Sequence, residues 1–264
     1  MEKPWLMGID LGGSGARCIL VNRSSKMMIS ASGSWQFSCA PGTFGTGFDI
    51  DLDEVWAVTG KACRDALLQA DIDPSNVAAM AVSAMRFSTV LLDENGSSLL
   101  AVPNLDARAA GEYFEIAGKL GPQLLQETGT WPLPLHAASR LLYLKNQQPD
   151  TYARVRTLFG MGEWLNHRLS GVRAIDASLG SATGLFSLTE RAWCWSLIDA
   201  LDLPREIFPP VIDSGCPLGK LTAEAAAHLG LPADVMVGMG GADTQCSLVG
   251  SAVIEPQECA VVAG

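Results

Sequence analysis

Basic residues are scarce in this sequence. Its 264 residues include 18 lysines and arginines against 28 aspartates and glutamates, which gives a formal net charge of −10 at pH 7. A protein that binds nucleic acid or an anionic membrane surface needs a basic footprint on its own surface. The charge balance therefore argues against both classes of partner, and an anionic small ligand would need a locally favourable site.

Long apolar runs and paired cysteines are also missing. No stretch reaches the ~18 apolar residues that cross a bilayer, and the first residues contain no apolar run of signal-peptide length. The seven cysteines include no C-x-x-C pair, which argues for reduced thiols and against structural zinc. We expect a cytoplasmic globular protein with one large core or two modest ones.

The sequence does contain an alternation of strand and helix patterns. Residues 7–22 and 26–31 predict a three-stranded meander. A capping pattern at Asp51 and Glu54 predicts a helix that extends to about Gln69. The apolar run at 77–83 is typical of a strand buried on both faces. Strands joined by crossing helices indicate an α/β domain.

A region from about 103 to 214 differs from this pattern, being mostly helical with looping connections. Helices are predicted at 109–119, 136–145 and 163–170. We expect this region to be a helical insertion in the α/β domain. Its Trp193-Cys194-Trp195 cluster is interpreted as packing.

The α/β pattern returns after this region. A strand is predicted at 235–238 between helices at 223–229 and 242–248, and an apolar segment at 259–263 reads as a further strand. Gly264 follows this segment directly. We therefore expect the chain to be part of a longer protein.

The first candidate site is a glycine-rich turn after Asp10. The turn reads Gly12-Gly13-Ser14-Gly15, and a second strand follows at 17–21. Glycines let backbone N–H groups converge on an anion, usually a phosphate. The turn has neither the GxxxxGK[ST] nor the GxGxxG spacing. It is either a phosphate-binding hairpin whose Asp10 orients Mg²⁺ through water, or a plain hairpin with Asp10 as an ordinary turn residue.

A second glycine-rich element precedes Asp243. Gly238-Met239-Gly240-Gly241 follows an apolar strand, and Asp243 falls in the first turn of the next helix. Phosphoryl transfer requires positioning, neutralisation of charge and one base, and two carboxylates could divide these tasks. The alternative is that Asp243 is simply a helix N-cap.

These residues resemble the FGGY family of carbohydrate kinases, which have an actin-like ATPase (ribonuclease H-like) fold. Four motifs carry the resemblance, in order IDLGGSGAR, SAMRFSTVLLDENG, NLDARAAGE and GMGGADTQCSLVG. They span nearly the whole chain but only the first of the family's two domains. The resemblance implies that residues 1–264 are the N-terminal, sugar-binding and catalytic-base domain, and that a C-terminal nucleotide-binding domain is missing.

The resemblance also implies roles for individual residues. Asp10 corresponds to the magnesium-orienting carboxylate and Asp243 to the catalytic base, which faces a primary hydroxyl of the sugar. The first phosphate loop and the basic position after it correspond to Gly12, Gly13, Ser14 and Arg17. The positions that contact substrate correspond to Met85, Arg86, Phe87, His136 and Thr244, together with Asp243.

Several of these residues have structural alternatives. Arg86 follows a buried strand, at the end where open α/β sheets bind ligands, but it could instead pair with Asp106 or Asp93. Asp106 and Arg108 could form a structural pair. His136, at the start of a helix, could be a cap or a packed residue.

The sugar is left open by departures from the family pattern. Pentulose kinases commonly read Gln-Met-His where this chain has Ala84-Met85-Arg86, and glycerol kinases follow the Arg with Glu where this chain has Phe87. Asn104 replaces the usual Trp before Asp-x-Arg, as is also seen in the autoinducer-2 kinase branch. Pentuloses, the autoinducer-2 precursor and tetritols are all left open as the substrate.

The resemblance implies an ATP- and Mg²⁺-dependent kinase that phosphorylates a primary hydroxyl of a small linear sugar or polyol. The expected partners are a small-molecule sugar and, as an open option, a second copy in a homodimer. The rival functions are a non-catalytic actin-like sugar-binding module and another actin-like phosphotransferase. We expect the 264-residue chain alone to be inactive because half of the nucleotide site is missing.

Overall fold

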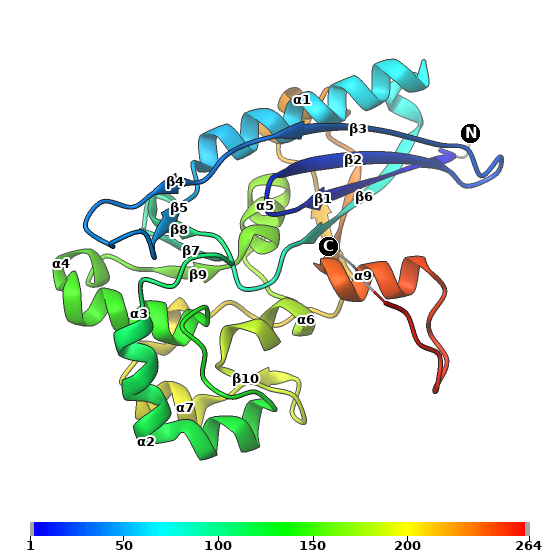
Figure 1. Ribbon diagram of the computed structural model, residues 1–264. Helices are drawn as coiled ribbons and strands as arrows, with labels where there is room; N and C mark the ends of the chain where they lie inside the picture. The colour runs from blue at the N-terminus through cyan, green and yellow to red at the C-terminus, as the bar shows by residue number, and fades with distance from the viewer. Residues whose placement is uncertain (1–2, 262–264) are drawn as a thin grey trace.

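The main sheet occupies the upper half of the view in Figure 1, which draws the computed structural model; the structure describes residues 3–261. Within these residues the strand order is β12-β13-β6-β1-β2-β3. β6 pairs in parallel with both β1 and β13, and the other neighbours are antiparallel. The strands are β1 (Trp5–Leu11), β2 (Gly15–Asn22), β3 (Met28–Ser34), β6 (Val77–Ala84), β12 (Pro217–Lys220) and β13 (Met236–Ala242).

One face of this sheet carries the first hydrophobic core. Along β1 the side chains of Trp5, Met7, Ile9 and Leu11 are buried, whereas Asp10 belongs to the opposite, more open face. The buried face packs against α1 (Leu52–Ala70), α5 (Met161–Ser170) and α8 (Ala223–Leu229). The predicted meander, the strand near 77–83 and the helices near 52–69 and 223–229 are therefore confirmed.

Helix α1 begins where the capping pattern predicted. The Asp51 carboxylate accepts hydrogen bonds from the N–H groups of Asp53 and Glu54, at 2.9 and 3.0 Å. These bonds satisfy two backbone donors that have no partner inside the helix. Asp71, in the left-handed conformation, ends the helix.

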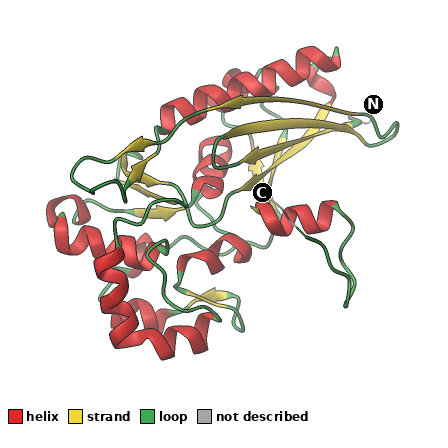
Figure 2. Ribbon diagram, viewed as in Figure 1, coloured by secondary structure: helices red, strands yellow, loops and turns green. Residues whose placement is uncertain are grey.

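A second core lies among the helices away from β1–β3, in the lower part of Figure 2. Trp193 and Cys194 are buried in it, as predicted, whereas Trp195 is partly exposed. The remaining helices are α2 (Ala110–Thr128), α3 (Ala137–Gln147), α4 (Pro149–Tyr152), α6 (Ala177–Gly180), α7 (Trp195–Ala200) and α9 (Asp243–Gly250). The remaining strands are β4 (Ser38–Cys39), β5 (Phe48–Asp49), β7 (Thr89–Leu92), β8 (Ser98–Val102), β9 (Thr157–Phe159), β10 (Phe186–Ser187) and β11 (Ala192–Trp193).

The region 103–214 contributes to both cores. Its helix α5 packs on the main sheet, and its strand β9 joins β7 and β8 in a second, three-stranded sheet that the sequence pattern did not predict. Helix α2 continues through Pro122 to Thr128, well beyond the predicted end at 119. Among the described residues, no helix has the length and apolarity needed to cross a membrane.

The strand expected at 259–263 was wrong for residues 259–261, which have no regular structure and are exposed. A strand needs a neighbour for its backbone groups, and here the exposed segment pairs with none within the described residues. The remainder of that segment lies outside the described residues.

A buried ionic cluster centred on Asp106 joins the two cores. Arg108 Nε donates to Asp106 Oδ2 at 2.7 Å, and Arg140 Nε lies 3.5 Å from Oδ1. Arg140 also donates to the carbonyl of Phe87 and to that of Pro103. Asp106 and Arg140 are fully buried, so each depends on the other to offset its lost hydration. Asp106 and Arg108 are thus a structural pair.

We predict that Asp106→Ala lowers the free energy of unfolding by about 3–5 kcal/mol, because it leaves the buried Arg140 without its carboxylate and leaves Arg108 with Asp49 alone. Urea unfolding followed by circular dichroism measures the change. Asp234→Ala is the matched control: it removes an exposed pair with Lys3 and should cost at most about 1 kcal/mol. Equal losses in the two variants would contradict the prediction.

Candidate functional site

The two predicted carboxylates lie near the carboxyl ends of neighbouring strands. Asp10 on β1 is paired with Ser83 on β6, and Ser83 is paired with Gly241 on β13. The Ser83 hydroxyl donates to Asp10 Oδ1 at 2.6 Å. Two strand spacings, about 10 Å, therefore separate Asp10 from Gly241, two residues before Asp243. Parallel pairing brings both carboxylates to one edge of the sheet.

The thiol of Cys246, one turn into α9, lies close enough to several carboxylates for their charges to affect its pKa. Burial raises the pKa of its thiol, and the negative charges of Asp176, Asp10 and Asp243 raise it further. These three carboxylates thus lie near a single point although they come from distant parts of the sequence. This agrees with the strand pairing that places Asp10 and Asp243 near each other, and Asp176 was not predicted to be part of the group.

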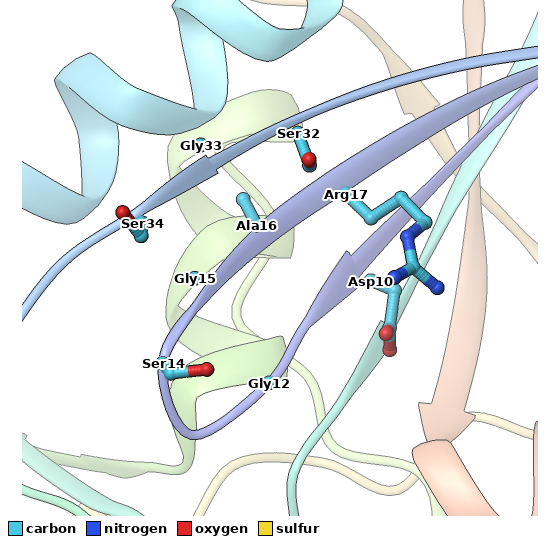
Figure 3. A pocket seen from close by; sticks show the side chains of 9 residues that line it. All are labelled: Asp10, Gly12, Ser14, Gly15, Ala16, Arg17, Ser32, Gly33 and Ser34. Atoms are coloured by element: carbon cyan, nitrogen blue, oxygen red, sulfur yellow. The ribbon is translucent and has the colours of Figure 1, made fainter.

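The glycine turn borders a hollow of about 400 Å³ (Figure 3). The Gly12 N–H donates to the Gly15 carbonyl at 3.0 Å, which closes the turn. A Cβ at Gly13 would meet nothing within 4 Å, and one at Gly12 would meet only the Gly15 carbonyl oxygen, at 3.7 Å. Neither residue has the positive φ that favours glycine. The fold therefore does not require glycine here, but close approach of a ligand would.

Polar side chains surround the same hollow. Arg17 stands opposite Asp10 in the β1–β2 pairing, and in Figure 3 the two side chains extend toward the same space. Ser14 lies at the tip of the turn. The hollow thus offers bare backbone, a hydroxyl and a cation, which is suitable chemistry for a phosphate group.

Asp243 is the first residue of α9, and the N-cap position belongs to Ala242. The Thr244 N–H donates to Asp243 Oδ1 at 2.7 Å, and the Thr244 hydroxyl lies 3.3 Å from the same oxygen. Among the described residues, no hydrogen bond is made to Oδ2. This carboxylate oxygen is available to a ligand.

Arg86 does not form either of the ion pairs considered above. Asp106 pairs with Arg108 and Arg140, and Asp93 pairs with Arg154 at 2.9 Å. The Arg86 guanidinium instead lies 4.9 Å from the centre of the Phe87 ring. Its buried Nε has no hydrogen-bond partner among the described residues. An unpaired cation beside the site favours contact with a ligand.

Thr244 lies on α9 beside Asp243, and the other predicted substrate residues lie on the Arg86 loop or behind it. Met85 is buried, and its N–H donates to the Leu11 carbonyl, which ties the loop to the end of β1. His136 is also buried and stacks on Phe87 with ring centres 5.9 Å apart. Burial and the nearby Arg140 and Arg86 charges lower the pKa of His136 to about 4, so its ring is neutral.

A magnesium site at this edge would rest on few protein ligands. No group of three His, Cys, Asp or Glu side chains gathers to hold a metal within residues 3–261. Mg²⁺ is commonly held by one or two carboxylates together with waters and substrate phosphates. Asp10, a carboxylate beside the polar hollow at the glycine turn, fits that mode of binding.

The strand order and the two carboxylates at the sheet edge define an actin-like (ribonuclease H-like) α/β domain. Residues 5–250 match the profile of the FGGY family of carbohydrate kinases, N-terminal domain, and the chain belongs to this family.

The most similar relatives include two enzymes named autoinducer-2 kinase. That of Yersinia enterocolitica is 34% identical over 98% of this chain and 50% of its own length, and that of Escherichia coli K12 is 32% identical over 100% and 50%. The chain thus spans about half the length of the curated relatives it matches. The xylulose kinase structure from Rhodospirillum rubrum matches with a TM-score of 0.87 at 23% identity, over 96% of this chain and 51% of its own. Its likeness confirms the fold.

A buried glutamate near the site was missed by the sequence analysis. Glu163, fully enclosed at the start of α5, accepts a hydrogen bond from the Gly160 N–H at 2.9 Å through Oε2. Burial, and then the charge of Asp176, raises its pKa to about 8. The only sequence signal was a Glu three residues after a glycine that precedes a helix.

We predict that this glutamate makes the protein less stable as the pH rises. The folded state holds the proton that the unfolded state releases near pH 4.5, so stability is lost as pH rises from there toward about 8. Glu163→Gln keeps the acceptor and should flatten this decline in the free energy of unfolding. Glu224→Gln, at an exposed site on α8, is the control. An unchanged pH profile in Glu163→Gln would contradict the assignment.

Proposed function

We propose that this domain takes part in the ATP-dependent phosphorylation of a primary hydroxyl on a small linear sugar or polyol. The observation that carries the proposal is the convergence of Asp10 and Asp243 on one sheet edge, around the Ser83 strand end. Two carboxylates in this relation can serve charge neutralisation and proton transfer separately.

Asp243 is the proposed base. Its Oδ1 is held by Thr244, which leaves Oδ2 to accept the proton of the sugar hydroxyl. As that proton leaves, the hydroxyl oxygen bonds to the γ-phosphorus of ATP and the bond between this phosphorus and the β–γ bridging oxygen breaks. The products are a sugar phosphate and ADP, with the proton on Asp243.

The glycine turn is the proposed phosphate site. The Gly13 N–H, the Ser14 hydroxyl and the Arg17 guanidinium would face the phosphate oxygens of ATP, and Gly12, whose N–H closes the turn, would leave room for their approach. Asp10 would orient Mg²⁺ through water, and the ion would neutralise charge on the transferred phosphoryl group. The Ser83 hydroxyl holds the Asp10 carboxylate in place for this role.

The sugar is proposed to lie against the loop of Met85, Arg86 and Phe87, with Thr244 beside the base and His136 supporting the Phe87 ring. Arg86, which has no carboxylate partner among the described residues, would donate to the sugar hydroxyls through its terminal nitrogens. Two similar relatives are named autoinducer-2 kinase, which favours the precursor of that molecule within the proposed class. Pentuloses and tetritols belong to the same class.

The complete reaction is proposed to need more than this chain, which spans half the length of its relatives. A second domain would supply the adenosine pocket, and closure of the two domains would exclude water from the transfer. We place the reaction in the cytoplasm, and a homodimer remains compatible with it.

We predict that Asp243→Asn in the intact kinase lowers sugar-dependent turnover by at least ~10², as expected for loss of a general base. Sugar binding, followed by calorimetry, should survive because Asn keeps the shape of the side chain. Asp213→Asn, an exposed carboxylate paired with Arg191, is the control. Undiminished turnover would remove Asp243 from the mechanism, and sugar binding with no turnover in the unmodified protein would favour a non-catalytic sugar-binding module.

We predict that the 264-residue chain alone turns over negligibly. It lacks the proposed adenosine pocket and the water-excluding closure, although it retains the base. A coupled assay of ADP release, with the intact kinase at equal concentration as the reference, measures the difference. Full turnover by the isolated chain would overturn the two-domain requirement.

A further inference from the structure

A chain of hydrogen bonds leads from the backbone beside Asp243 into the protein. The Ala242 N–H donates to the Ser178 hydroxyl at 2.8 Å, and that hydroxyl donates to Asp176 Oδ2 at 2.6 Å. The Ser214 hydroxyl donates to the same oxygen at 3.0 Å. The Gly241–Ala242 peptide group, one residue before the proposed base, is thus held by Ser178, whose hydroxyl is in turn held by Asp176.

Asp176 is itself fixed in place. It is buried, and its carboxylate accepts from the N–H groups of Ser178 and Leu179, at 2.8 and 3.1 Å, as the N-cap of α6. A buried carboxylate with several donors keeps one orientation, because rotation would leave those donors unpaired. It therefore presents Oδ2 to the Ser178 hydroxyl in a fixed direction.

The glycine before Ala242 allows this contact. A Cβ at Gly241 would lie 2.9 Å from Ser178 Oγ and 3.4 Å from Asp176 Oδ2. At Gly240 a Cβ would fall 1.7 Å from the Val82 carbonyl oxygen, so β13 can approach β6 closely only without a side chain there. Gly240 and Gly241 thus let the end of β13 approach Ser178 closely, and the Ser178 hydroxyl accepts the Ala242 N–H.

We infer that Ser178 and Asp176 are positioning residues for phosphoryl transfer, acting through the Ala242 peptide to aim the Asp243 carboxylate. This inference rests on the proposed function. Neither side chain touches substrate in this role. They fix the first turn of α9, whose side chains are partly or fully exposed and which makes little packing of its own. The rate of transfer depends steeply on the position of the base, since a displacement of the reacting groups by about 1 Å can lower the rate about 10²-fold.

The test compares Ser178→Ala with Ser181→Ala in the intact kinase. Ser181 is a matched control because it lies on the following turn and donates to the Ser178 carbonyl, without contact to Ala242. Ser178→Ala should lower kcat roughly 10-fold to 100-fold with KM for the sugar unchanged, whereas Ser181→Ala should match the unmodified protein. Adding Ser178→Ala to Asp243→Asn should cause no further loss, because the serine acts through the base.

An equal effect of the two alanine variants, or an additive loss in the double variant, would overturn the inference. A second measurement tests the inference independently of the proposed function. Hydrogen exchange of the Ala242 amide in the 264-residue chain should be slow, and should accelerate in Ser178→Ala but not in Ser181→Ala. Absence of any sugar-dependent ADP release in the intact protein would defeat the proposed function, and unchanged Ala242 exchange in Ser178→Ala would defeat the inference by itself.

Discussion

Backbone hydrogen bonds between β1, β6 and β13 fix where the carboxylates of the site can be. Because the three strands are parallel, their carboxyl ends meet at one edge, and residues about 230 positions apart in sequence become neighbours there. The pairing of β13 with β6 shifts register between Gly238 and Gly241, and this irregularity re-aims the chain just before α9 begins. A side chain at Gly240 would force the strands apart, so this glycine belongs to the geometry of the site.

The second constraint is a strained loop that carries Phe87. Its φ of 61° lies in the left-handed region that bulky residues avoid, and such a conformation persists only where the surroundings enforce it. Arg140 donates to the Phe87 carbonyl, while Arg86 and His136 lie against its ring. The buried cluster around Asp106 therefore does more than join two cores, because it also holds the loop on which the proposed sugar site is built.

The sequence was most informative where a pattern is local. The Asp51 cap and the apolar run at 77–83 each predict structure from a few adjacent residues, and these predictions agree with the structure. The glycines before Asp243 were expected to follow the strand, but they lie inside β13, where Gly240 permits close approach to β6. The motifs also indicated the family, which the comparisons confirm. The roles of the site residues stay predictions. The burial of Asp176 and Glu163, and the bonds that join Asp176 to Ser214 and Ser178 to Ala242, could not be predicted, because they are created by tertiary packing between distant segments. Strand β9 was missed for a similar reason: three residues carry no detectable period, and only pairing with β7 makes them a strand.

The space around Gly12 and Gly13 means that a substitution there can affect the proposed ligand site without affecting folding. Since a Cβ at either position meets no close neighbour, alanine there would leave the fold intact and would escape cellular quality control, which removes proteins that unfold. A variant with such a substitution would therefore remain folded and abundant while it loses the proposed phosphate binding. A substitution at either of these two glycines would therefore act on the proposed ligand site, whereas one at Gly240 would act first on the sheet.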